Sequence, residues 1–134
     1  MKLMIGGYAQ GRLSYALKKY HLTEQDVWDA ANAGNPDAWR DKKIIYHAEE
    51  FVTKYLKTNQ DVLQEIRNRL PDLQDKIIIT QEVGCGLVPI DPEERRWREA
   101  VGHMNQLLAE YSESVERVCC GLGMYLKLNQ IRLD

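Results

Sequence analysis

The sequence lacks most of the features that place a chain in a special structural class. Its 134 residues include only three cysteines, Cys85, Cys119 and Cys120, and no Cys-x-x-Cys spacing occurs. An odd number of cysteines without that spacing gives no support to a disulfide framework or a zinc knuckle. We interpret all three as small buried hydrophobic residues. On a strand, Cys119 and Cys120 would point to opposite faces, which disfavours joint metal binding.

Long apolar runs and a one-sided charge are also missing. No segment approaches the roughly 18 consecutive apolar residues that span a membrane. The apolar run 1–5 is too short for a signal peptide, and glycines end it. The net charge of -2 provides no broad basic field for nucleic acid. We therefore expect a cytoplasmic protein that binds neither membranes nor nucleic acid.

The composition that is present is ordinary for a globular protein. Hydrophobic residues make up 44% of the chain and charged residues 28%, and the length is typical of one domain. A chain of this size can bury a core without metal ions or disulfides. We expect a single domain over residues 1–134.

Hydrophobic periodicity predicts strands that alternate with helices. Strands are expected at 2–5, 26–29, 43–46, 76–80 and 114–120, and helices at 11–20, 48–56, 59–70 and 91–111. The last helix should begin at its Asp-Pro pair and bury Trp97, Val101, Met104, Leu108 and Tyr111. Gly121 and Gly123 are expected to end the last strand, and residues after 127 are left unassigned. This order predicts an α/β fold, with a mainly parallel sheet and helices on both sides.

A glycine-rich turn joins the first predicted strand to the first helix. It has the spacing of a phosphate-binding loop, G-x-x-x-x-G-K-[ST], over Gly6, Gly7, Tyr8, Ala9, Gln10, Gly11, Arg12 and Leu13. In such loops backbone N–H groups and a helix N-terminus converge on phosphate oxygens. Here Arg12 replaces the lysine and keeps its charge, whereas Leu13 replaces the hydroxyl residue and cannot hold Mg²⁺. The turn therefore either binds a nucleotide or anion, or is a tight strand-to-helix connection kept for its backbone geometry.

Two further segments resemble the motifs of a known family. Residues 78–89, Ile-Ile-Thr-Gln-Glu-Val-Gly-Cys-Gly-Leu-Val-Pro, resemble the pattern hhxNEVGxGhVP, in which h is apolar. Residues 94–106, Glu-Arg-Arg-Trp-Arg-Glu-Ala-Val-Gly-His-Met-Asn-Gln, resemble xRxWRxxxGRhNQ, and 118–122 resemble a closing strand and glycine turn. With the N-terminal turn, these segments are similar to adenosylcobinamide kinase/adenosylcobinamide-phosphate guanylyltransferase of cobalamin biosynthesis. The resemblance covers about residues 1–20 and 76–127.

The resemblance implies a RecA-like P-loop fold, GTP or ATP as ligand, a corrinoid substrate and a homo-oligomer. Family enzymes phosphorylate adenosylcobinamide and then transfer GMP from GTP through a histidine. His47 is the one histidine near the corresponding region, but it directly follows the third predicted strand, which argues against a nucleotide-carrying role. Tyr46 stands where that strand normally ends in a metal-assisting aspartate. Together with Leu13, this substitution puts Mg²⁺ in doubt.

Other candidate site residues lie inside the matching segments. Glu82 follows the strongest strand, where it either binds a metal or accepts a proton, or is a solvated loop acid. Arg95 and Arg98 are candidates for binding substrate phosphate, or they belong to a solvated face with Glu94–Arg98 as an i,i+4 pair. Asn105 is expected to cap a helix or bridge loops.

Three hypotheses follow from these residues and the resemblance. The first is a nucleotide-binding family member with a degraded catalytic set. The second is an active but divergent kinase or nucleotidyltransferase in which Glu82 helps hold the metal. The third is a non-catalytic module that acts through homo-oligomeric assembly.

Overall fold

The computed structural model describes residues 1–32, 34–58, 61–84, 88–129 and 131–132. Its strands are β1 (Lys2–Gly6), β2 (Val27–Asp29), β3 (Ile44–Tyr46), β4 (Ile77–Gln81), β5 (Ser114–Cys119), β6 (Leu122–Leu128) and β7 (Ile131–Arg132). Its α-helices are α1 (Arg12–Lys19), α2 (Glu50–Lys57), α3 (Val62–Arg69) and α4 (Pro92–Tyr111), and short 3₁₀ turns cover Glu24–Asp26, Ala38–Asp41 and Leu70–Leu73.

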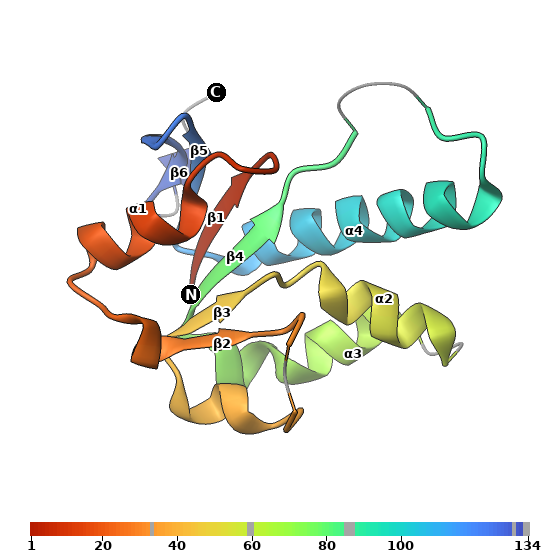
Figure 1. Cartoon of the computed structure of the whole chain (residues 1–134), viewed down its shortest axis with the longest axis horizontal. Coiled ribbons are helices and arrows are strands. Elements are labelled where there is room, and N and C mark those ends of the chain that lie inside the picture. The colour runs from red at the N-terminus through yellow and green to blue at the C-terminus, as the bar shows by residue number, and fades with distance from the viewer. Residues whose placement is uncertain (33, 59–60, 85–87, 130, 133–134) are drawn as a thin grey trace.

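The strands of the described residues form one sheet in the order β2-β3-β4-β1-β5-β6-β7 (Figure 1). The neighbours from β2 to β5 pair in parallel, whereas the β5–β6 and β6–β7 pairs are antiparallel. The α/β fold with a mainly parallel sheet is therefore confirmed. Because β1 to β5 run in parallel, their carboxyl ends lie along one edge of the sheet, which is where ligands bind in open α/β folds.

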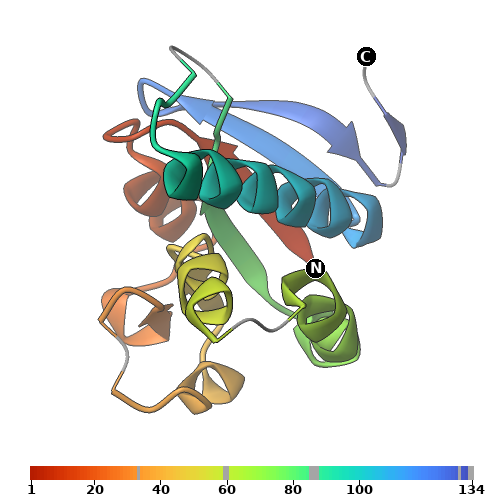
Figure 2. The same ribbon diagram turned by 90° about the vertical axis from the view of Figure 1, so that its right-hand side faces the viewer.

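Helices cover both faces of the sheet. One core cluster joins α2, α3 and α4 to one face, and a second joins α1 to the other. Figure 2 shows α2, α3 and α4 in front of the sheet and α1 behind it. Strand β4 divides between the two clusters, since Ile78 packs under α4 while Ile77 and Ile79 pack under α1. This arrangement confirms the prediction of a strand covered on both faces.

N-cap residues in the sequence mark the starts of α3 and α4. The Asp91 side chain accepts a hydrogen bond from the Glu93 backbone N–H at 3.0 Å, and Pro92 is the first residue of α4. This N-cap followed by proline is the predicted start of the helix. Asp61 caps α3 by accepting from the Gln64 N–H at 3.2 Å, and residue 59, where the sequence predicts this helix to begin, lies outside the described residues.

Most of the predicted inner face of α4 is buried, with one exception. Val101, Met104 and Leu108 are buried, and half-buried Trp97 packs against the same core. The prediction was wrong for Tyr111, which is 50% exposed. Tyr111 is the last residue of α4, and buried leucines one turn earlier already fill the inner face. In the described part of the chain, no helix has both the length and the apolar character that crossing a bilayer requires.

The carboxyl-terminal hairpin was not predicted from the sequence. Gly121 lies in a two-residue turn with Cys120, and Gly123 pairs with Val118 inside β6 instead of ending the sheet. Both turn residues have positive φ, 53° for Cys120 and 73° for Gly121, which is the type I′ geometry of tight hairpins. The prediction of buried cysteines was also wrong for Cys119 and Cys120, because this turn exposes both of them. Cys85 lies outside the described residues.

Candidate nucleotide-binding site

The glycine-rich turn lies at the carboxyl end of β1, between this strand and α1. Ala9 has φ 58° and Gly11 has φ 81°, so two of its residues adopt the left-handed conformation. Gly11 is also the N-cap of α1. The side chain of Tyr8 is 85% exposed, so the turn is open to solvent. The predicted strand, turn and helix are therefore present in the predicted order.

The glycines of this turn differ in what the fold requires of them. At Gly6 an added Cβ would lie 2.5 Å from the carbonyl oxygen of Val118, so β5 excludes any side chain there. Gly11 needs its positive φ. At Gly7 an added Cβ would meet only Gln10 Cγ at 3.7 Å, an ordinary contact, and its φ is not in the left-handed region. The backbone geometry of the protein thus explains glycine at positions 6 and 11 but not at position 7.

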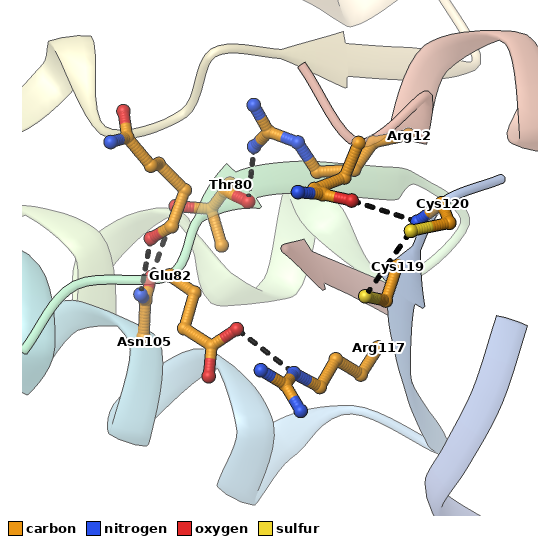
Figure 3. Close-up of polar contacts among 9 residues, drawn as sticks. Arg12, Thr80, Glu82, Asn105, Arg117, Cys119 and Cys120 are labelled. Atoms are coloured by element: carbon orange, nitrogen blue, oxygen red, sulfur yellow. Dashed lines mark hydrogen bonds and ion pairs between the residues drawn. The ribbon is translucent and has the colours of Figure 1, made fainter. Parts of the chain in front are cut away.

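The Arg12 side chain is buried beneath this turn. Its stem passes Gly6, and its guanidinium donates to the carbonyl oxygen of Thr80 at 2.5 Å (Figure 3). The positive charge predicted from the sequence therefore lies near the carboxyl end of β4. Leu13 packs with the apolar cluster under α1, so its backbone is the part of this residue available to a ligand.

A buried carboxylate that the sequence did not single out lies beside this arginine. Glu49 precedes α2, and its Oε2 accepts a hydrogen bond from the Gln81 backbone N–H at 3.2 Å. Burial raises the pKa of Glu49, while backbone hydrogen bonds and the nearby charges of Arg12 and His47 oppose that rise. The sequence did contain a signal for Glu49: it is an acidic residue three positions after β3, whose carboxyl end lies at the edge of the sheet where ligands bind.

His47 pairs with an acid at the end of the neighbouring strand. Its Nδ1 lies 2.7 Å from Asp29 Oδ1, and its ring stacks on Tyr46 with centroids 3.7 Å apart. Asp29 Oδ1 also accepts from the Ala31 backbone N–H at 2.9 Å, which fixes the carboxylate. Because Nδ1 contacts the carboxylate, Nε2 is the ring nitrogen that would act in a reaction. The sequence indicated His47 but not Asp29, although Asp29 ends a predicted strand.

Glu82 and Arg98 line one small cavity beyond the end of β4. The cavity has a volume of about 190 Å³, and Trp97 and Gly84 also line it. Glu82 Oε2 accepts from Arg117 Nε at 3.0 Å (Figure 3), an ion pair that the sequence did not suggest. Arg98 contacts Glu94 at 3.4 Å, the alternative i,i+4 pair.

The other predicted residues of α4 take different positions. Arg95 is exposed and does not line the cavity of Glu82 and Arg98. Asn105 links α4 to the end of β4, rather than capping a helix or bridging loops as expected. Its Oδ1 accepts from Thr80 Oγ1 at 3.0 Å and its Nδ2 donates to the Gln81 carbonyl oxygen at 3.0 Å. Among the described residues, no group of three or more His, Cys, Asp or Glu side chains is placed to hold a metal ion.

Comparison with known proteins connects this geometry to a family. The model of the family "Cobinamide kinase / cobinamide phosphate guanyltransferase" matches residues 39–126. This match includes the segment 76–126 that carries the sequence resemblance, extends over 39–75, and leaves out the glycine-rich turn. A curated relative, the bifunctional adenosylcobalamin biosynthesis protein CobU of Salmonella typhimurium, is 37% identical over 51 residues. Those residues are 38% of this chain and 28% of that protein. Since the family model covers well over half of the chain, this protein belongs to the cobinamide kinase/cobinamide phosphate guanyltransferase family.

Proposed function

We propose that this protein binds the phosphates of GTP or ATP at the turn 7–13, with reduced or lost catalysis in cobalamin biosynthesis. The observation that carries the proposal is the glycine at position 7, which neither steric contact nor φ explains. A phosphate that approaches the backbone closely would account for a missing side chain at this position of a phosphate-binding turn. The N-terminus of α1 and the left-handed residues of the turn support an anion in the same place.

The altered side chains support the loss of catalysis. Leu13 offers no hydroxyl for Mg²⁺, and Tyr46 ends β3 without a carboxylate. The Arg12 guanidinium donates a hydrogen bond to the Thr80 carbonyl oxygen, and the Glu82 carboxylate forms an ion pair with Arg117, so both charged groups are engaged by the protein itself. A member with these residues retains the backbone features of phosphate binding while it lacks the side chains that activate a metal.

Titration calorimetry with GTP, ATP and GMP, with and without Mg²⁺, tests the binding proposal. We expect binding of GTP or ATP that depends little on Mg²⁺. Gly7→Ala should weaken that affinity by about tenfold, or about 1.4 kcal/mol, with an unchanged melting temperature. Gly34→Ala, at an open surface position, is the matched control. No heat at millimolar nucleotide, or full affinity in Gly7→Ala, would refute the proposal.

The Asp29–His47 pair favours a second, catalytic candidate. An imidazole oriented by a carboxylate is an effective nucleophile or base, and its Nε2 would carry a guanylyl group or accept a proton. Incubation with adenosylcobinamide and GTP, followed by mass analysis, separates the two functions. The binding proposal expects neither a phosphate nor a guanylyl mass increase on the corrinoid or the protein. An increase that His47→Gln abolishes would establish the catalytic candidate instead.

The exposed side of β6 favours assembly of identical chains as an additional property. Leu122, Met124, Leu126 and Leu128 are spaced along this strand, which carries a β-bulge opposite Val115 and Glu116, and they are 37–74% exposed. Such an apolar row is typical of a protein interface. Light scattering during size-exclusion chromatography should give a mass above that of one chain, and Leu126→Lys should reduce it. A monomer at micromolar concentration would contradict assembly.

A further inference from the structure

Two exposed thiols lie side by side at the turn between β5 and β6. Cys119 is the last residue of β5 and Cys120 begins the turn. Their sulfur atoms are 4.0 Å apart (Figure 3), and both side chains are exposed. Neither thiol belongs to the residues proposed to bind nucleotide.

The turn geometry brings these sulfurs together. Consecutive side chains of a regular strand point to opposite faces, so two adjacent cysteines would normally be separated. Cys120 has φ 53° because it occupies the first central position of the I′ turn. This left-handed conformation places its Sγ on the same side as that of Cys119. A non-glycine residue held in this conformation costs about 1–3 kcal/mol, and such residues recur in switch regions.

The same turn is hydrogen-bonded to the glycine-rich turn. The backbone N–H of Cys120 donates to Gln10 Oε1 at 2.8 Å, and the N–H of Gly121 donates to the Gln10 carbonyl oxygen at 2.9 Å. Gly121 also lies close to Gly11, since an added Cβ at Gly11 would be 3.6 Å from the Gly121 Cα. A change of backbone conformation at Cys120 therefore acts directly on Gln10.

We propose that Cys119 and Cys120 form a redox-sensitive dithiol that small disulfides oxidise to a vicinal disulfide, and that its closure releases Gln10 from the hairpin turn. The Cys119 thiolate attacks one sulfur of the small disulfide and expels one thiolate, which takes up a proton. The Cys120 thiolate then attacks Cys119 Sγ in the mixed disulfide and expels the second small thiol. Two protein thiols are oxidised, one small disulfide is reduced, and the two protein protons pass to the two small thiols.

The order of attack and the reversibility follow from the local structure. Hydrogen bonding to the Cys119 sulfur raises the pKa of Cys120, which disfavours Cys120 as the thiol that attacks first. Consecutive Cα atoms are about 3.8 Å apart, below the usual disulfide range of about 4.4–6.8 Å. The ring is therefore strained and easily reduced, and relief of that strain changes the turn conformation. Because Gln10 belongs to the turn proposed to bind nucleotide, a consequence of its release for nucleotide binding rests on the proposed function, whereas the oxidation and the release do not.

Mass spectrometry of the full chain tests the oxidation. Cys85→Ser leaves only the two adjacent thiols, and oxidised glutathione is the probe. We expect the loss of two hydrogen atoms, reversed by dithiothreitol, and localised to residues 119–120 by fragmentation of both this variant and the natural chain. Cys120→Ser in the same background should instead retain one glutathione as a mixed disulfide. No reaction, or stable mixed disulfides on both cysteines, would overturn the proposal.

Amide hydrogen exchange tests the release of Gln10. In the oxidised chain the amides of residues 120–121 should exchange on the order of tenfold faster, and those of β4 should not change. The Gln10→Ala variant should already show the faster exchange at Cys120 in its reduced form. Unchanged exchange on oxidation would overturn the coupling. The exchange measurement is made without nucleotide, so it still tests the release of Gln10 if the proposed nucleotide binding turns out to be wrong.

Discussion

Gly123→Ala gives a sharp test of how the carboxyl-terminal hairpin packs on α1. Gly123 lies inside β6, directly against the side chains of Tyr15 and Glu116. A Cβ at this position would overlap Tyr15 Oη, Tyr15 Cζ and Glu116 Oε2. Tyr15 donates a hydrogen bond to Glu116, which is only 3% exposed, and Lys19 pairs with the same carboxylate at 2.8 Å. An added methyl group must therefore displace a buried, charged cluster.

The expected loss of stability follows from three contributions. Overpacking of a well-packed site costs about 1–3 kcal/mol. A lost hydrogen bond to a charged group costs about 1.5–3 kcal/mol. Replacing glycine by alanine recovers about 0.4–1 kcal/mol through the unfolded chain. The net loss is about 1.5–5.5 kcal/mol, which lowers the melting temperature by roughly 5–20 °C for a chain of this size.

Urea and thermal unfolding, followed by circular dichroism, measure this loss. Gly34→Ala is the control, because a Cβ there meets no atom within 4 Å, and it should change stability by less than about 0.5 kcal/mol. In a double-mutant cycle, Tyr15→Ala should remove most of the penalty of Gly123→Ala. If Gly123→Ala is as stable as the natural chain, or the two changes are additive, the described packing of β6 on α1 is wrong.

Three other substitutions test the ligand edge of the sheet and the start of α4. Asn105→Ala should destabilise the protein by about 1–3 kcal/mol, because it leaves Thr80 and the carbonyl group of Gln81 without their shared partner. Glu49→Gln should flatten the pH dependence of the melting temperature. The raised pKa of Glu49 means that its contribution is fully present below the pKa of the unfolded carboxyl and is lost as pH rises through the folded value. Asp91→Ala should cost about 1 kcal/mol through the lost N-cap of α4.

Each of these variants has a matched control. Gln106→Ala, at an exposed position of α4, should be neutral, and equal losses for positions 105 and 106 would contradict the link that Asn105 makes between α4 and β4. Glu99→Gln should keep the pH dependence of the natural chain between about pH 4 and pH 7. An unchanged slope in Glu49→Gln would show that its burial has no effect on ionisation. Asp91→Asn should restore most of the loss measured for Asp91→Ala, since asparagine caps equally well.

The sequence by itself determined the features that depend on neighbouring residues. Three consecutive isoleucines predict the strand at 77–79 because β-branched side chains suit a strand covered on both faces. The Asp91-Pro92 pair locates the start of α4, since a cap and a fixed φ act within one turn of chain. The glycine spacing likewise locates the turn after β1. Local conformational preference decides each of these elements.

Only the tertiary structure decided which distant groups meet. The partner of Arg12 is the Thr80 carbonyl group, 68 residues away, and the partner of Glu82 is Arg117, 35 residues away. Strand β6 escaped prediction because its leucines and Met124 are exposed to solvent, and because the glycines of the turn before it resemble a strand end. Side-chain partners across a sheet depend on strand order and register, which no local pattern encodes. Strand order also explains why the turn at Cys120 contacts Gln10, which lies 110 residues earlier in the chain.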